Sequence, residues 1–396
     1  MTIPQAEVVQ RIAEFQKLMQ QHQLDMAFLM QGADLFYYAG VFQQGILWIP
    51  AAGEPIFFVR RSYSGAKRYS PLKQVTPIKS LRQMPELLAA QGHKIAGVAG
   101  IESDVLPLQQ YELLHEIFPN LHFKNCSPII REQRSVKSVW ELSVLRQGAA
   151  IMDRVYAEFI PQIQLGMTEL EISARIEYLM RSKGHQGVVR IRGMSSEFHY
   201  GLVLAGNNGS VPSFFDGALG GSGLGPSVPK GAGETKLNAN EPLLVDYVGC
   251  FGGYCVDTTL VFVFGELPEE LRRAHQLALD IQQAIMAAAK PGATCEAVYE
   301  LSLTLAKQGG FSANFMGCDD TQVKFVGHGV GIELNELPVL TRNNPMQLLP
   351  NMVMAIEPKF IFPGQGAVGT ESVFVVTAQG LERLNHYELN IIKLGT

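Results

Sequence analysis

The spacing of apolar residues changes several times along the chain. Residues 4–31 predict an amphipathic helix and then a short buried strand, because apolar positions recur at helical spacing and then run together. Residues 35–60 contain apolar runs on both sides of a turn at Gly53, which predicts a strand-rich stretch with a hairpin. Helical and strand patterns then alternate to about residue 130, which indicates an α/β layout with its own core.

A polar and basic stretch interrupts this alternation at residues 131–139. Such a stretch is typical of a domain boundary, so we expect one domain at 1–131 and a second at 132–396. A chain of 396 residues is long enough for two cores of ordinary size.

The second domain contains two similar segments of equal length, 166–184 and 292–310. Each has the pattern Gly-x-Thr, an apolar-periodic helix and a terminal glycine, with Thr168 and Thr294 as N-caps. Each also follows another helix and precedes strands, so helix–helix–strands occurs twice. This pattern predicts an internal duplication with a sheet under the helices and a shared site between the halves. Chance similarity of two capped helices is the alternative.

The strand region of the first half contains an unusual segment. Strands are expected at 188–193 and 202–206, but residues 213–233 are Gly-rich and lack periodicity. Loops of this length inside a compact domain are usually functional or disordered, so this insertion is a candidate part of the site.

Two apolar, β-branched runs flank Gly252-Gly253 in residues 242–264 and predict a hairpin. Each run carries one carboxylate, Asp246 and Asp257. The two are directly paired if the turn is centred on Phe251-Gly252 and diagonal if it is centred on Gly252-Gly253, and they share a face in both registers. Buried carboxylates must be paired or bind a metal, whereas a solvated face with two unrelated aspartates is the alternative.

Three further candidate ligands follow in apolar strand contexts: His328 in GHGVG, Glu357 before a proline, and Glu371 at the start of the last apolar strand. Four carboxylates that share a site repel one another unless cations neutralise them. Oxygen-rich ligation with one imidazole suits Mn²⁺, Co²⁺ or Zn²⁺. Two such ions about 3.5–4 Å apart can share a bridging hydroxide and polarise a carbonyl.

In order and spacing, these residues resemble the metal ligands of the metallopeptidase M24 family, in its Xaa-Pro aminopeptidase, prolidase and creatinase-like branch. The five matching positions are Asp246, Asp257, His328, Glu357 and Glu371. The resemblance covers essentially the whole chain. It implies an α+β fold, with a pita-bread C-terminal domain of pseudo-twofold symmetry after a smaller α/β creatinase-type N-terminal domain. It also implies a dinuclear metal site, cleavage after an N-terminal residue, and a homodimer.

The sequence departs from this family at positions near the chemistry. Asn335 stands where family peptidases carry a histidine, and Ser213 is the best match for a second one. Gly369 stands where many prolidase-like members carry an arginine. The resemblance gives those histidines a role in positioning substrate, and loss of such a donor typically costs about 10²–10³ in rate. Asn335 can still donate a hydrogen bond, so Glu357 and Asn335 are the candidate catalytic residues.

Composition narrows the possible partners. A net charge of −5 without a Lys/Arg block argues against nucleic acid, and no apolar run reaches membrane-spanning length. Five cysteines without disulfide spacing and a polar N-terminus predict a reduced, cytoplasmic protein.

The sequence therefore predicts a dinuclear-metal-dependent hydrolase of the Xaa-Pro aminopeptidase or dipeptidase type, with a small peptide as substrate and Glu357 as metal ligand and proton shuttle. One alternative is a metalloenzyme of this fold that acts on a non-peptide small molecule, as a lyase or an amidinohydrolase-like enzyme. The other is a metal-binding but catalytically silent homologue.

Overall fold

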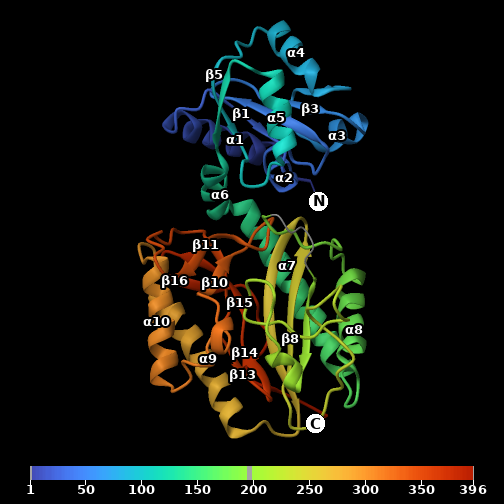
Figure 1. The fold of residues 1–396 in the computed structure, drawn as a ribbon, viewed down its shortest axis with the longest axis vertical. Coiled ribbons are helices and arrows are strands. Elements are labelled where there is room, and N and C mark those ends of the chain that lie inside the picture. Colours follow the sequence, from blue (N-terminus) through green and yellow to red (C-terminus); the bar gives the residue numbers. More distant parts are fainter. Residues whose placement is uncertain (1, 194–198, 396) are drawn as a thin grey trace. The chain divides into compact units, whose positions relative to one another are not determined.

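The computed structural model describes residues 2–193 and 199–395, which form two compact units (Figure 1). The first unit comprises residues 2–134 together with Arg192 and Gly193, and the second comprises the other described residues. The polar stretch expected at the domain boundary, residues 131–139, is partly helical. Helix α6 (Ser127–Ser135) runs through its first half, because Ile129 and Ile130 supply a buried apolar side to an otherwise polar segment.

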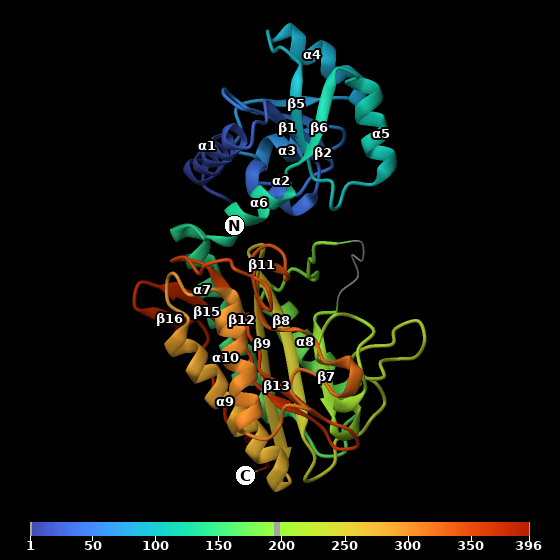
Figure 2. The same cartoon turned by 60° about the vertical axis from the view of Figure 1, so that its left-hand side comes forward.

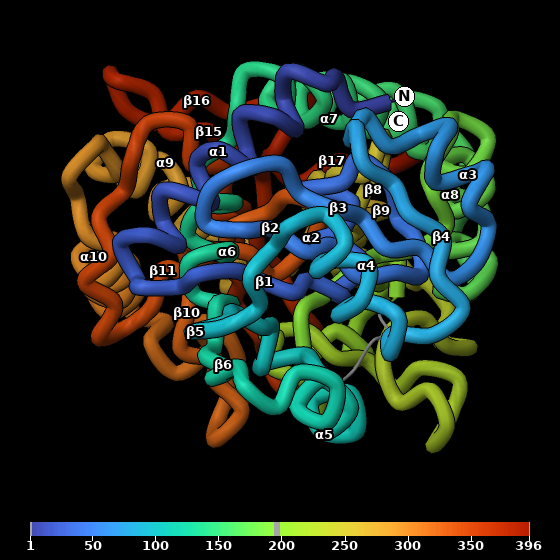
Figure 3. The backbone as a smooth tube through the Cα atoms, turned by 90° about the horizontal axis from the view of Figure 1, so that it is seen from above, coloured from blue at the N-terminus to red at the C-terminus, as the bar shows by residue number. Residues whose placement is uncertain are grey.

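The first unit is built on a six-stranded sheet of order β4-β3-β2-β1-β5-β6, drawn in blue to cyan in Figure 3. Its helices and strands before α6 are α1 Gln5–Gln21, β1 Met26–Leu29, α2 Gly32–Ala39, β2 Gly45–Pro50, β3 Ile56–Val59, α3 Tyr63–Tyr69, β4 Val75–Pro77, α4 Met84–Ala90, β5 Gly97–Ile101, α5 Leu108–Ile117 and β6 Leu121–Asn125. Apolar residues of α4 and α5 form one core with the strands, whereas α1 lies on the other side of the sheet (Figure 2). The predicted hairpin around Gly53 is confirmed, because β2 and β3 pair antiparallel.

The stretch 35–39 is helical, so the prediction that the strand-rich region begins at Leu35 was wrong. The Gln31 side chain accepts a hydrogen bond from the Asp34 backbone N–H at 2.8 Å and caps helix α2, which ends at Gly40 with φ 75°. Most of this short helix is buried, so its residues form a continuous apolar run that period alone cannot distinguish from a buried strand.

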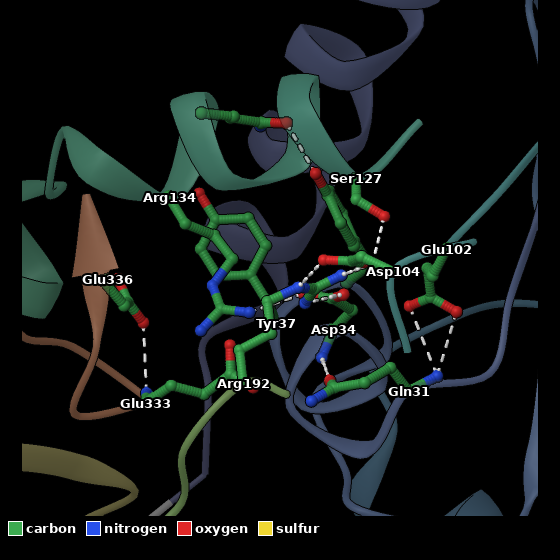
Figure 4. A network of polar contacts seen from close by, with 12 residues as sticks. Gln31, Asp34, Tyr37, Glu102, Asp104, Ser127, Arg134, Arg192, Glu333 and Glu336 are labelled. Atoms are coloured by element: carbon green, nitrogen blue, oxygen red, sulfur yellow. Dashed lines mark hydrogen bonds and ion pairs between the residues drawn. The ribbon is translucent and has the colours of Figure 1, made fainter. Parts of the chain in front are cut away.

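An ion cluster in the first unit is built around the buried carboxylate of Asp34, on α2 (Figure 4). Asp34 Oδ1 accepts from Arg134 Nη1 at 2.6 Å, and Asp34 Oδ2 accepts from Arg192 Nη1 at 2.9 Å. Arg192 also donates to both carboxylate oxygens of Asp104, at 2.6 and 3.0 Å. Burial alone would raise the pKa of Asp34, but the two guanidinium groups lower it, so the carboxylate stays ionised.

The second unit contains the duplicated pattern. Its helices and strands are α7 Val139–Phe159, α8 Glu169–Ser182, β7 Gly201–Ala205, β8 Leu243–Phe251, β9 Tyr254–Phe264, α9 Glu269–Ala288, α10 Cys295–Gln308, β10 Phe325–Gly329, β11 Glu336–Thr341, β12 Val353–Ile356, β13 Lys359–Phe362, β14 Gly366–Gly369, β15 Ser372–Thr377, β16 Gly380–Arg383 and β17 Ile392–Leu394. The larger sheets have the orders β17-β9-β8-β7 and β11-β10-β12-β15-β16, and β13 and β14 form a separate ribbon.

Each half consists of two helices and a sheet, as the repeated sequence pattern predicts. Helices α7 and α8 pack on the β7–β9 sheet, and α9 and α10 pack against the strands of the second half (Figures 1 and 2). Thr168 forms a capping box with Glu171, and Thr294 accepts a hydrogen bond from the Ala297 N–H. Both predicted N-caps are confirmed.

The strand expected at 188–193 does not form. Gly187 and Gly193 bracket this segment with φ of 83° and 145°, values that L-residues rarely adopt. The Arg190 carbonyl accepts from the Leu334 N–H at 2.7 Å, which is a single contact and not a ladder. In residues 2–193 and 199–395, no helix combines the length and apolar character that crossing a membrane requires.

Candidate metal centre

The hairpin of β8 and β9 places Asp246 and Asp257 on one face. Gly252 and Gly253 both have positive φ and form the turn, and Phe251 pairs with Tyr254 across it. Asp246 of β8 therefore lies opposite Thr259 of β9. Thr259 is two residues after Asp257 on β9, so the two aspartates are diagonal neighbours. Of the two registers open from the sequence, the structure has the diagonal one.

Glu371 lies where the sheets of the two halves meet. Thr259 and Glu371 exchange two backbone hydrogen bonds of 3.3 Å, which joins β9 to the start of β15. The Thr259 hydroxyl also donates to Glu371 Oε2 at 2.8 Å. The duplication thus brings a carboxylate of the second half beside the hairpin of the first.

His328 comes from β10, between Gly327 and Gly329. Added Cβ atoms at these glycines would lie 2.4 Å from the Ala355 carbonyl oxygen and 2.1 Å from the Leu337 carbonyl oxygen, so only glycine permits this close strand packing. His328 Nδ1 lies 3.2 Å from the Gly329 carbonyl oxygen, which leaves Nε2 facing Glu357 Oε1 at 3.4 Å and Asp257 Oδ2 at 3.9 Å.

A lysine that the sequence analysis overlooked lies inside this cluster. Lys359 is the first residue of β13, and its Nζ donates to Glu357 Oε2 at 2.8 Å, Glu371 Oε2 at 2.9 Å and Asp246 Oδ2 at 3.0 Å. Its side chain is 3% exposed, so this ammonium is held by three carboxylates away from water. The structure therefore brings all five predicted metal ligands together, with a cation of the chain among them.

The electrostatics of the cluster follow from burial and crowding. Burial, with the charge of Asp246 next, raises the pKa of Asp257 to about 7. Burial alone would raise the pKa of Glu357, but the Lys359 charge and the His328 hydrogen bond lower it to about 2. Burial opposes protonation of His328, yet Glu357 and the neighbouring carboxylates raise its pKa to about 10. These opposed shifts mark a crowded acidic site that requires positive charge.

Three residues offer ligand atoms that converge. One side-chain atom each from Asp257, His328 and Glu371 lies within 4.8 Å of the others. Glu371 Oε1 is buried and has no hydrogen-bond partner in the described part of the chain. A buried carboxylate oxygen left in this state is costly, so one divalent ion fits here. Asp246 Oδ2 differs from Glu371 Oε1, because it accepts a hydrogen bond from Lys359 Nζ at 3.0 Å.

The Gly-rich insertion contributes a second cation. Lys230 is 8% exposed, and its Nζ lies 5.3 Å from the centre of the Phe215 ring. Burial lowers the pKa of Lys230, and the charges of Asp246 and Glu357 raise it in part, so this lysine is within electrostatic reach of the cluster.

A buried carboxylate at the start of α8, Glu169, anchors the insertion. Glu169 accepts from the Gly233 N–H at 2.9 Å and from both the Ala205 N–H and the Asn208 side chain. Asn208 in turn accepts from the Ser222 N–H at 2.8 Å. These contacts hold the insertion at its last residue, Gly233, and near its middle, at Ser222.

Ser213 and Asn335, which stand at the positions of the two family histidines, lie outside the helices and strands. Ser213 is half-buried, and its hydroxyl accepts from the Phe215 N–H at 3.0 Å, so it stabilises a local turn. Asn335 is half-buried in the connection between β10 and β11. The catalytic role of Asn335 stays a prediction.

Comparisons with known proteins agree with this architecture. Residues 143–378 match the model of metallopeptidase family M24, and residues 11–136 match that of the creatinase/prolidase N-terminal domain. An Xaa-Pro dipeptidase of Pyrococcus furiosus is 25% identical over 386 residues, which is 97% of this chain and 99% of that protein.

Solved structures show the same fold. An Xaa-Pro dipeptidase from Bacillus anthracis superposes with a TM-score of 0.83 at 21% identity, covering 98% of this chain and 100% of that one. An X-Pro aminopeptidase from Thermotoga maritima gives 0.80 at 22% identity, covering 97% and 99%. The predicted creatinase-type N-terminal and pita-bread C-terminal domains are confirmed, and these relatives support a peptidase-type hydrolase. Because the family model spans more than half of the sequence, the chain belongs to metallopeptidase family M24.

Proposed function

We propose that this protein hydrolyses short peptides after the N-terminal residue, with a preference for Xaa-Pro bonds, and that the reaction needs a divalent ion. The observation that carries this proposal is the convergence of Asp257, His328 and Glu371 within 4.8 Å, beside a buried carboxylate oxygen without a hydrogen-bond partner in the described residues. The Xaa-Pro preference comes from the names of relatives such as the Pyrococcus furiosus dipeptidase.

A divalent ion held by these three residues would supply Lewis acidity, which activates water and polarises a peptide carbonyl. Glu357 lies between Lys359 and His328, at 2.8 and 3.4 Å, and we assign it the transfer of a proton from water to the leaving amine. Asn335 is proposed to donate a hydrogen bond to the substrate. The buried Lys359 ammonium places positive charge beside the carboxylates.

The number of ions in the family-type mechanism is two, and for this chain that number stays a prediction. The metal identity among Mn²⁺, Co²⁺ and Zn²⁺, the homodimer and the cytoplasmic location are also predictions from the resemblance and the composition. Lys359 bears directly on the ion number, because it lies among the carboxylates that a second ion would need.

A second candidate is a small non-peptide substrate on the same site. It is favoured by the buried Lys230 of the Gly-rich insertion, which places an ammonium near the cluster, together with Asn335 and Ser213 at the positions of the family histidines. An anionic small molecule would be held by such a lysine.

Hydrolysis of a library of dipeptides and tripeptides in Mn²⁺ or Co²⁺ tests the proposal. We expect the protein to release N-terminal residues, with Xaa-Pro peptides cleaved fastest, and we expect EDTA to abolish this release. If the protein binds the ion and no peptide is cleaved, peptide hydrolysis is wrong and the non-peptide candidate stands.

A further inference from the structure

The position of Lys359 determines how many ions this centre can hold. An ion bound to carboxylate oxygens lies about 2.0–2.2 Å from each of them. Lys359 Nζ lies 2.8–3.0 Å from one oxygen each of Asp246, Glu357 and Glu371. An ion that used these three oxygens would overlap the ammonium, so the two cations exclude each other.

The carboxylate of Glu371 shows how the space is divided. Its Oε2 accepts hydrogen bonds from Lys359 Nζ and from the Thr259 hydroxyl, at 2.9 and 2.8 Å. Its Oε1 is buried without a hydrogen-bond partner among the described residues and belongs to the side chain that converges with Asp257 and His328. One oxygen thus serves the lysine and the other is left for an ion.

The backbone is shaped to accommodate this lysine. Lys359 pairs with Gly369 across the β13–β14 ribbon. A Cβ atom added at Gly369 would lie 2.7 Å from Lys359 Cα and 2.9 Å from Lys359 Cγ. Because real Cβ atoms essentially never approach other atoms within 3.0 Å, the missing side chain at Gly369 leaves room for the lysine where it begins to turn toward the cluster.

Charge balance agrees with a single ion. The carboxylates of the cluster are Asp246, Asp257, Glu357 and Glu371, which carry four negative charges when ionised. One divalent ion with the Lys359 ammonium supplies three positive charges, whereas two divalent ions with this ammonium would supply five. With Lys359 in place, a second divalent ion would therefore leave more positive than negative charge in a buried site, and burying unbalanced charge is costly.

We propose that the Lys359 ammonium is a built-in cation that replaces the second metal ion, so that the protein binds one divalent ion, on Asp257, His328 and Glu371. This proposal rests on the proposed function only in requiring that the centre binds a divalent ion, and it does not depend on the substrate. The ammonium keeps one positive charge beside Asp246, but it cannot coordinate water or a carbonyl as a second ion would.

The test is the number of ions bound by the full-length chain after EDTA treatment and titration with Mn²⁺ or Co²⁺. Calorimetry and elemental analysis give the stoichiometry. The expected ratio is one ion per chain for the wild type and two for Lys359→Ala. Lys324→Ala removes an exposed lysine from the same unit and should retain one ion. Circular dichroism and thermal unfolding, with and without Mn²⁺, check that each variant is folded.

A spectroscopic measurement on the wild type keeps the test valid if Lys359→Ala does not fold. Electron paramagnetic resonance at saturating Mn²⁺ should show an isolated ion and no exchange-coupled pair. Two ions per wild-type chain, or a coupled pair, would overturn the role of Lys359 and leave the metal-dependent hydrolase intact. No ion bound by either the wild type or Lys359→Ala would instead remove the basis of the proposed function.

Discussion

Glu357 and Lys359 form a buried ion pair of 2.8 Å although they are only two residues apart in the chain. Residues i and i+2 of an extended strand point to one face, and Pro358 keeps the backbone extended between them. Glu357 directly follows β12 and Lys359 begins β13, and these two strands belong to different sheets. A positive and a negative side chain from one segment thus enter the same centre.

Substitution of a residue that binds the ion and substitution of a residue that binds Lys359 should have different effects on ion binding. His328→Ala is expected to abolish binding of the single ion, because the imidazole converges with Asp257 and Glu371. Asp246→Asn should retain one ion, because Asp246 Oδ2 contacts the Lys359 ammonium. Calorimetric titration with Mn²⁺ measures both. Equal loss of binding in the two variants would contradict the assignment of Asp246 to the lysine.

Lys230 is expected to affect substrate binding more than ion binding. Lys230→Met removes a buried ammonium beside the cluster and should lower kcat/KM about tenfold or more, as expected for loss of a charged hydrogen-bond partner. Lys230→Arg should retain most of the activity, and Lys236→Met alters an exposed lysine shortly after the insertion as a control. An unchanged KM for every cleaved peptide in Lys230→Met would argue against contact with substrate.

Asn335 offers a test of the expected hydrogen-bond donor. Asn335→Ala should lower kcat by about 10²-fold with a smaller change in KM, because loss of a donor to the transition state typically has this effect. Asn335→His should retain activity, since an imidazole also donates. Steady-state kinetics at saturating Mn²⁺ check the values. If the alanine variant is as active as the wild type, Asn335 is not a catalytic residue.

His275 predicts a loss of stability in acid. It is buried in α9, with Nε2 2.9 Å from the Leu389 carbonyl oxygen, and burial lowers its pKa from 6.5 to about 4. The unfolded chain therefore binds this proton first. The contribution of neutral His275 is complete above pH 6.5 and is lost as the pH falls to about 4, by up to about 3 kcal/mol.

Urea unfolding between pH 7 and pH 4 measures this contribution. His275→Gln should show a shallower fall of the free energy of unfolding over this range than the wild type. The exposed His122 provides a control, and His122→Gln should follow the wild-type profile. Parallel profiles for the wild type and His275→Gln would exclude His275 as a source of acid sensitivity.

The ion cluster of the first unit should be essential to its stability. Asp34→Ala leaves the Arg134 and Arg192 guanidinium groups buried without their shared partner, which is expected to cost about 3–5 kcal/mol. Glu116→Ala breaks an exposed pair with Arg82 and should leave Tm nearly unchanged. Thermal unfolding followed by circular dichroism compares the two. A similar Tm for both variants would show that the buried cluster does not stabilise the unit.

Much of the site could be predicted because its ligands interrupt apolar strands. Asp246 and Asp257 share parity around Gly252-Gly253, so both hairpin registers place them on one face, and the structure only selects between the registers. The repeated helix pattern capped by Thr168 and Thr294 likewise fixed the duplication. Period 2 and cap chemistry are local properties, so they are visible in the sequence.

Lys359 had a local signal that the sequence analysis did not use. It lies two residues after Glu357, so the parity argument already applied to the aspartates places it on the same face. Lys230 had no such signal, since it lies in an insertion without periodicity, and its burial depends on the anchoring of that loop by Glu169. The helical stretch 35–39 also lacks the alternation of apolar and polar residues that identifies a helix, because nearly all of its residues are buried.

The sequence by itself determined which residues have the chemistry of the centre and which faces they occupy, since side-chain period and capping depend on neighbours in the chain. Only the tertiary structure decided how close the cations of the chain come to the carboxylates from other segments. Lys359 comes from the β13–β14 ribbon, Lys230 from the Gly-rich loop and Glu371 from the point where the sheets meet. Distances between such segments depend on packing. A difference of a few ångströms in these distances determines whether a carboxylate contacts an ammonium group or a metal ion.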